Sequence, residues 1–126
     1  RGKCKNVIVC SQRVTGSGNL PYVAAIDSDA TCIGPGAFKD CISLTEVQIH
    51  DSVTSIGYHS FEGCTSLSEV QIPSSVTRIY RSAFRGCTSL TELQFPISVT
   101  SISESAFEGC TSLTKVEIPN SVTSIG

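Results

Sequence analysis

Like residues recur every 23 positions along most of this 126-residue chain. Self-similarity at a fixed period of this length is typical of solenoids, in which each repeat packs only against its neighbours. The sequence therefore predicts stacked coils rather than one globular core. Since most recurring residues build the coils, a specific activity belongs at positions that break the pattern. The clearest columns are Cys41, Cys64, Cys87 and Cys110; Phe38, Phe61, Phe84 and Phe107; and Leu44, Leu67, Leu90 and Leu113.

Composition and charge exclude several classes of function. The formal net charge of −2 is too small to favour nucleic acid as a partner. No stretch approaches the roughly 18 apolar residues of a membrane helix, so we expect no membrane insertion. Arg1 is not an initiator residue, and no apolar signal region follows it, which predicts a processed form or a piece of a longer chain.

One coil, residues 64–86, shows how the repeat is expected to fold. Apolar residues alternate with polar ones along a first strand, which ends at Pro73 because proline lacks an N–H and fixes φ. Apolar residues return along a second extended segment and a short helical or 3-10 turn. The expected inward residues are Leu67, Val70, Ile72, Val76, Ile79, Ala83 and Phe84. The predicted fold class is a β-rich solenoid with one main parallel sheet, a second short extended side and short helical or 3-10 turns.

The repeat register divides the chain into two regions. Residues 30–126 form a solenoid of three full coils with partial coils at both ends. Residues 1–29 are expected to form an N-terminal capping segment with a degenerate first coil, and residues 7–9 are a candidate capping strand. In that first coil, Leu20, Val23 and Ala25 resemble a strand displaced by one residue. The last coil has no polar cap, which predicts either a truncated protein or self-association through this coil.

The repeat resembles the BspA-like, or Treponema pallidum-type, class of leucine-rich repeats. The shared pattern is C-x-x-L-x-x-V-x-I-P-x-S-V-T-x-I-x-x-x-A-F-x-G, and it covers about residues 30–126. The chain departs from it at Asp40, His50, Asp51 and Ser60. The resemblance implies a surface or secreted protein that adheres to host matrix proteins or to other cells. It implies no catalytic residues, and hence no enzyme activity and no cofactor.

The seven cysteines need two explanations. The four in the 23-residue column are expected to be small buried corner residues, in apolar surroundings that disfavour a thiolate. Cys4, Cys10 and Cys32 lie outside the column, and two of them can pair unless one joins Cys41. A disulfide among these three would suit a secreted protein; the alternative is that all seven cysteines are reduced. Neither the cysteine column nor the two histidines fits a metal site or a catalytic pair.

Polar residues on the outer side of the first strand form two columns. Directly opposed like charges destabilise a sheet, so an exposed column of glutamates is a candidate for binding a basic partner. The alternative is a solvated polar face, and metal binding is disfavoured. Sheets of repeat proteins are common binding surfaces, which makes this face a candidate site for protein binding. The columns are Glu46, Glu69, Glu92 and Lys115, and beside them Gln48, Gln71, Gln94 and Glu117.

The coil of residues 64–86 departs most from the repeat. It carries Arg78, Tyr80 and Arg81, which with Arg85 form a basic cluster around one aromatic residue. Arg and Tyr are enriched in binding hot spots, so this cluster is a second candidate for partner binding. The alternative is drift on a tolerant surface. A further column alternates in charge and predicts ion pairs between coils: Lys39, Glu62, Arg85 and Glu108.

These patterns predict a non-catalytic module that binds protein, in a secreted or cell-surface protein. The expected partner is a host matrix or cell-surface protein, or a second copy of the chain. The alternative is a structural subunit that stacks end to end into a filament or coat. We expect no nucleic acid, cofactor or metal as a ligand.

Overall fold

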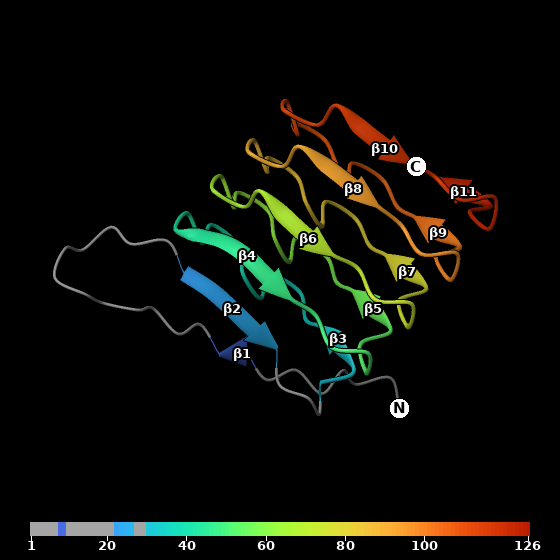
Figure 1. Cartoon of the computed structure of the whole chain (residues 1–126), viewed down its shortest axis with the longest axis horizontal. Coiled ribbons are helices and arrows are strands. Elements are labelled where there is room, and N and C mark those ends of the chain that lie inside the picture. Colours follow the sequence, from blue (N-terminus) through green and yellow to red (C-terminus); the bar gives the residue numbers. More distant parts are fainter. Residues whose placement is uncertain (1–7, 10–21, 27–29) are drawn as a thin grey trace, which may run out of the picture.

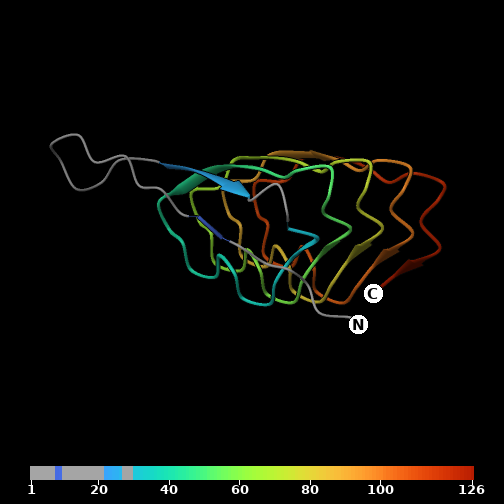
Figure 2. The ribbon, with the colours of Figure 1, turned by 90° about the horizontal axis from the view of Figure 1, so that it is seen from below.

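The computed structural model describes residues 8–9, 22–26 and 30–126 of the chain. Within these residues the chain winds as a solenoid, whose coils follow one another in sequence order along one axis (Figure 1). Two rows of short strands run along the stack, and turns connect them in a closed, flattened loop (Figure 2). The described residues contain no helix. The β-rich solenoid that the 23-residue period predicts is confirmed.

The first row of strands begins with an antiparallel pair and continues in parallel. Strand β1 pairs antiparallel with β2, and parallel pairing joins β2 to β4, β4 to β6 and β8 to β10. The register between β2 and β4 shifts between Tyr22 and Val23, at the irregular first coil. The row consists of β1 (Ile8–Val9), β2 (Tyr22–Ile26), β4 (Leu44–Gln48), β6 (Glu69–Gln71), β8 (Glu92–Gln94) and β10 (Lys115–Glu117).

This first row is interrupted between β6 and β8. Strands β1, β2, β4 and β6 form one sheet, and β8 and β10 form another. The second row has no such break and is one five-stranded parallel sheet. The expected main sheet is therefore two sheets, and the short extended side is the continuous one. The second row consists of β3 (Cys32–Ile33), β5 (Ser55–Ile56), β7 (Arg78–Ile79), β9 (Ser101–Ile102) and β11 (Ser124–Ile125).

The third side of each coil is a series of hydrogen-bonded turns. The backbone amides of Phe38, Phe61 and Phe84 each donate to a carbonyl of the next coil, at 2.7 to 2.8 Å. Residues with positive φ recur on this side in two columns. A residue in this left-handed conformation cannot continue a right-handed helix. The expected helical or 3-10 pieces are therefore single turns. The two columns are Gly36, His59, Ser82 and Ser105, and Asp40, Gly63, Gly86 and Gly109.

The core is a stripe of the recurring apolar residues. The rings of Phe38, Phe61, Phe84 and Phe107 are stacked, with centroids 5.1 to 5.3 Å apart from one coil to the next. The leucines of the same coils, from Leu44 to Leu90, are fully buried. Since each coil covers the apolar side chains of the one before it, burial and aromatic stacking together set the spacing of the coils.

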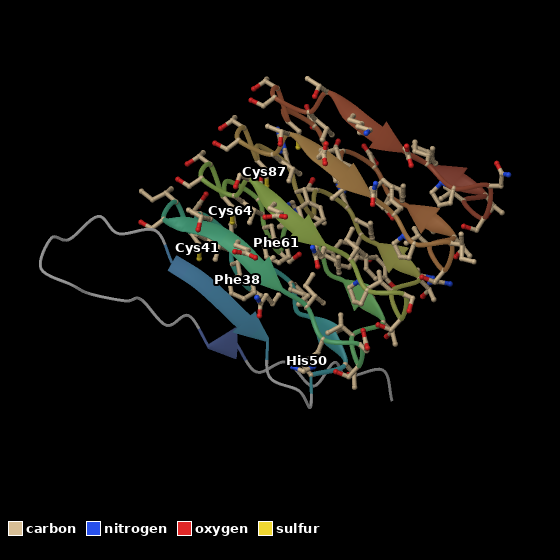
Figure 3. The ribbon with its side chains drawn as sticks, viewed as in Figure 1. Phe38, Cys41, His50, Phe61, Cys64 and Cys87 are labelled. Atoms are coloured by element: carbon tan, nitrogen blue, oxygen red, sulfur yellow. The ribbon has the colours of Figure 1, made fainter. Side chains whose placement is uncertain are left out.

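Cys41, Cys64 and Cys87 lie one above another along one side of the stack (Figure 3). Cys64 and Cys87 are fully buried, and Cys41 and Cys110 are partly buried. The thiols of Cys64, Cys87 and Cys110 donate hydrogen bonds of 3.0 to 3.2 Å to phenylalanine carbonyls of the neighbouring coil. Burial raises the pKa of Cys87, and the neighbouring thiols of Cys64 and Cys110 raise it further. The expectation of buried corner residues is confirmed for Cys64 and Cys87.

The described residues cover only part of the N-terminal predictions. Strand β1 contains two residues of the expected capping strand and pairs with β2. The disulfide was expected among Cys4, Cys10 and Cys32, and of these Cys4 and Cys10 lie outside the described residues, as does Leu20. The disulfide and the division of the chain at residue 30 therefore stay predictions. Among the described residues, no apolar helix reaches the length needed to cross a membrane.

Candidate binding surface

The outer face of the first row carries the two predicted polar columns. Strand alternation turns the residues between them inward, so Val70 and Leu93 are only 6% and 2% exposed. Glu46 is partly buried, and the seven other column residues are exposed. The structure thus brings the polar side chains to one surface of the solenoid.

The glutamate column is not continuous, which corrects the expected stack of three. Glu46 pairs in register with Glu69 across β4 and β6. Glu92 pairs instead with Lys115 across β8 and β10, which is an attractive combination. Because the sheet stops between β6 and β8, Glu69 and Glu92 are not register partners. One like-charged pair and one opposite-charged pair therefore lie on either side of the interruption.

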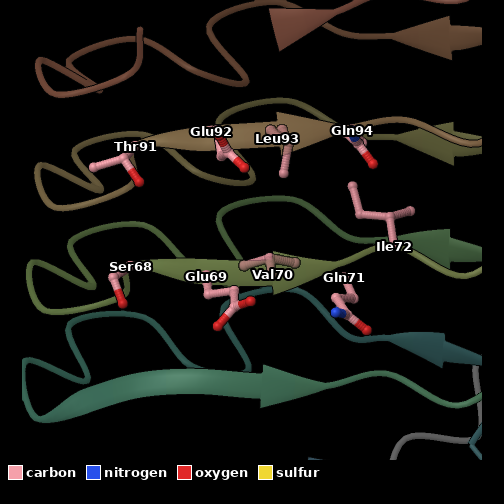
Figure 4. A pocket seen from close by; sticks show the side chains of 9 residues that line it. All are labelled: Ser68, Glu69, Val70, Gln71, Ile72, Thr91, Glu92, Leu93 and Gln94. Atoms are coloured by element: carbon pink, nitrogen blue, oxygen red, sulfur yellow. The ribbon is translucent and has the colours of Figure 1, made fainter. Parts of the chain in front are cut away.

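A groove of about 570 Å³ lies at the interruption (Figure 4). A second groove lies between the paired strands β4 and β6, and its volume is about 220 Å³. The larger opening thus coincides with the missing backbone pairing. The larger groove is lined by Ser68, Glu69, Val70, Gln71 and Ile72 on one side and by Thr91, Glu92, Leu93 and Gln94 on the other.

The hydrogen bonds just before the strands show the same separation. The amide of Ser68 donates to the Thr45 carbonyl at 3.1 Å, and the amide of Thr114 donates to the Thr91 carbonyl at 2.9 Å. The equivalent hydrogen bond between the two coils in the middle, from the Thr91 amide to the Ser68 carbonyl, is not formed. The hydroxyls of Ser68 and Thr114 also reach those carbonyls, at 3.5 and 3.4 Å, and Thr91 lacks this contact as well. The interruption therefore extends beyond the strand residues.

The coil of residues 87–109, which follows the interruption, has two enlarged side chains in its interior. Leu93 stands where the two preceding coils have valine, and Phe95 stands where they have isoleucine. Both are buried, and the ring of Phe95 packs edge-on against Phe107 with centroids 5.6 Å apart. Extra volume in a close-packed interior displaces its walls. We infer that Leu93 and Phe95 push β8 away from β6, while the opposite wall stays paired through β7 and β9.

The second candidate patch lies on the second row of strands. Arg78 is exposed on β7, and Tyr80 and the exposed Arg81 follow directly. The ring of Tyr80 packs against Tyr58 of the preceding coil, with centroids 5.0 Å apart, and Tyr58 is 48% exposed. The sequence prediction did not include Tyr58 in this patch. The sequence could have indicated this contact, because Tyr58 lies in the preceding coil at the repeat position next to that of Tyr80.

Arg85 lies in a chain of ion pairs rather than beside this patch's aromatic residues. A carboxylate oxygen of Glu62 lies 3.9 Å from Lys39 Nζ, and the other lies 3.7 Å from a terminal nitrogen of Arg85. Arg85 Nε lies 3.4 Å from Glu108, and His59 Nδ1 lies 2.7 Å from Glu62. The expected pairing along the column of alternating charge is confirmed. A structural role for Arg85 is favoured over a place in the basic patch.

The groove contains residues that sequence reasoning did not select. The sequence prediction included Glu69, Gln71, Glu92 and Gln94. It did not include Ser68 and Thr91, between which the backbone hydrogen bond is missing. The signal in the sequence was the pair of enlarged inward residues in a single coil. Among the described residues, no cluster of three or more His, Cys, Asp or Glu side chains can hold a metal ion.

Comparisons with known proteins agree with this architecture. The family described as BspA type leucine rich repeat region matches residues 19–126 in six copies. A leucine rich cell surface protein from Faecalibacterium prausnitzii is similar, with a TM-score of 0.73 and 36% sequence identity over 77% of this chain. The match spans 26% of that protein's length. The leucine rich repeat protein of T. pallidum has a similar fold, with a TM-score of 0.52 and 23% identity over 85% of this chain and 76% of its own. A search of curated proteins finds no match.

Proposed function

Because the chain belongs to the BspA-type leucine-rich repeat family, we propose that it is a non-catalytic module that binds protein through the outer face of its first strand row. The groove between β6 and β8 is the observation that supports this proposal most strongly. It is lined by polar side chains and interrupts an otherwise regular surface. Exposed faces of stacked repeats are common binding surfaces. The patch of Arg78, Tyr80 and Arg81 is a second surface for the same function, and its packing against Tyr58 supports it.

We propose that the module acts at the cell surface or after secretion. The similarity to a protein described as a leucine rich cell surface protein supports this location. In that setting the partner is a matrix or cell-surface protein of a host, and the module serves adhesion or recognition.

A pull-down from host extract tests the protein-binding function. One variant reverses charge on the first face (Glu69→Lys with Glu92→Lys), and another removes the second patch (Arg78→Ser, Tyr80→Gly, Arg81→Ser). Asp51→Asn, at an exposed position outside both surfaces, is the matched control. We expect the first-face variant to abolish capture of at least one protein that the control retains. Capture that neither variant changes contradicts the proposed binding surfaces.

We further propose a disulfide among Cys4, Cys10 and Cys32, as is common in small secreted domains. Thiol counting in denaturant tests it. Of the seven cysteines, five thiols are expected to react without reductant, because two are in the disulfide. All seven are expected to react after reduction. Seven reactive thiols without reductant would mean that no disulfide forms.

The alternative function, a structural subunit that stacks end to end, stays a prediction. It requires self-association through the C-terminal coil. Filaments in negative-stain microscopy would support it, and a strict monomer in sedimentation at high concentration would contradict it.

A further inference from the structure

The coil of residues 64–86 carries two arginines whose charge no carboxylate offsets. Arg78 and Arg81 are exposed, and neither forms an ion pair with another described residue. By contrast, Arg85 of the same coil lies 3.7 Å from one glutamate and 3.4 Å from another, and Lys39 is also ion-paired. An arginine without a partner on the protein keeps its N–H donors free for an external anion.

Uncharged residues flank Arg78 along its strand row. Its register partners are Ser55 on β5 and Ser101 on β9, which lie on either side of β7 (Figure 1). All three residues precede a buried isoleucine, so strand alternation turns their side chains outward. The hydroxyls of Ser55 and Ser101 form no hydrogen bond with another described residue, whereas Ser75 and Ser98 each donate to a carbonyl of the preceding coil at 2.6 Å. A ligand at Arg78 therefore meets free hydroxyl donors and no carboxylate in this row.

An aromatic pair lies beside Arg78 on the same outer side. Tyr80 follows two residues later, with the buried Ile79 between them, and its ring packs against Tyr58 with the two planes tilted by 37°. Tyr58 is 48% exposed, so part of its ring faces solvent. Tyrosine offers a rigid apolar face at a low cost in side-chain entropy, and Arg and Tyr are both enriched in binding hot spots. The pair thus adds an apolar contact beside a free guanidinium.

The distribution of charge places the anion at Arg78 rather than at Arg81. Glu104 occupies the repeat position of Arg81 in the next coil and is exposed, so it opposes an anion on that side. In the row of Arg78, the five strands from β3 to β11 contain no other charged residue. A single cation in a neutral row suits one carboxylate better than a polyanionic chain, which needs several cations.

We propose that Arg78, with Tyr58 and Tyr80, binds an acidic side chain of a partner protein together with the apolar side chain that follows it. The proposal rests on the proposed protein-binding function and identifies the chemistry of the partner at the second surface. The guanidinium donates two parallel N–H bonds to the carboxylate, a geometry that lysine does not provide. The apolar side chain packs on the exposed part of the Tyr58 ring.

Peptide titration followed by NMR tests the proposal on the full ¹⁵N-labelled chain. The probe is the blocked pentapeptide Ser-Gly-Glu-Leu-Ser, with matched peptides that carry glutamine in place of glutamate or alanine in place of leucine. We expect the glutamate peptide to shift the amide signals of residues 55–58, 78–81 and 101–103. The glutamine peptide is expected to bind at least about fivefold more weakly, because the charge-assisted pair is lost. The alanine peptide is expected to bind about twofold more weakly, and Tyr58→Ser should abolish that difference.

Arg78→Gln is the decisive variant, and Lys39→Gln is its matched control. Both remove one positive charge from an exposed position, and Lys39 lies on the turn side of its coil. We expect Arg78→Gln to weaken binding of the glutamate peptide at least about fivefold, and Lys39→Gln to leave it unchanged. Equal weakening by the two variants would indicate general attraction to positive charge and would overturn the proposal. A glutamate peptide that shifts none of these signals would overturn it too.

A sulfated polysaccharide is the competing anionic ligand. A heparin hexasaccharide is therefore titrated in parallel. Heparin that shifts the same signals and depends on Arg78, where the glutamate peptide shifts nothing, would assign the site to a glycan and overturn the proposal.

The two proposals fail in different ways. Proteins captured in the pull-down by a chain that does not bind the glutamate peptide would leave the binding function and remove the site at Arg78. Peptide binding without any captured protein would keep the site and remove the protein-binding function. A chain that neither captures protein nor binds the glutamate peptide contradicts both.

Discussion

Ser60 is a residue whose chemistry does not suit its place in the repeat. Its column holds alanine in the other three coils, at Ala37, Ala83 and Ala106. Ser60 is fully buried, and its hydroxyl has no hydrogen-bond partner among the described residues. A buried hydroxyl left unsatisfied destabilises the folded state by about 1–3 kcal/mol. The repeat thus tolerates an unsatisfied hydroxyl in its core at Ser60.

Replacing Ser60 with Ala is therefore expected to stabilise the protein. The free energy of unfolding should rise by about 1 kcal/mol, because the unsatisfied hydroxyl is removed and the alanine of the neighbouring coils is restored. Urea unfolding at neutral pH measures this difference. Ser74→Ala, at an exposed position, serves as the control and should change little. An unchanged or lower stability for Ser60→Ala would show that the hydroxyl has a partner in solution.

The buried thiol of Cys87 predicts how stability depends on pH. Its pKa in the folded chain is raised above the ordinary 9.0 by burial and by its thiol neighbours. The unfolded chain therefore loses this proton first, so the stabilisation is complete below pH 9 and falls as pH rises above it. We expect a loss of roughly 1 kcal/mol per pH unit in urea unfolding between pH 9 and 10. The same slope in Cys87→Ala would contradict this assignment.

At the level of secondary-structure elements, an ion-pair chain connects the turn sides of the coils. Glu62 lies at its centre, with Lys39 and Arg85 on either side and His59 at 2.7 Å. Glu62→Gln should lower the free energy of unfolding by about 1 kcal/mol at low salt and by less at high salt, since exposed pairs are screened. Glu104→Gln is the control with no ion pair among the described residues. A loss that does not depend on salt would assign the effect to hydrogen bonding alone.

The sequence period predicts the elements better than their pairing. Strands form in both rows because apolar residues alternate at fixed positions of each coil. The break between β6 and β8 escapes the same reasoning, because Leu93 and Phe95 keep the inward apolar pattern and change only the volume of the interior. The turn side was expected to contain helical pieces, but His59 and Ser82 adopt positive φ without being glycine. A single sequence does not mark such positions.

At the scale of the whole molecule, three kinds of ladder hold successive coils together. They are backbone pairing along both strand rows, stacked phenylalanines in the core, and side-chain hydrogen bonds such as those from Thr77 and Thr100 to the preceding coil. The period places residues in columns, so the polar face and the charged column were predictable. The groove was not, because it depends on how two coils of different interior volume fit together. The contact between Tyr58 and Tyr80 was not predicted for a related reason, since it joins different columns.

Amide hydrogen exchange at Thr91 tests the separation of β6 from β8 most directly. Ser68 occupies the same column one coil earlier, and its amide is bonded to the Thr45 carbonyl. We predict that the Thr91 amide exchanges at least about tenfold faster than the Ser68 amide in the native protein. We also predict that Leu93→Val with Phe95→Ile slows exchange at Thr91 to the rate at Ser68. Equal protection of Thr91 and Ser68 in the wild type would mean that the two coils are hydrogen-bonded there, and would contradict an open groove between β6 and β8.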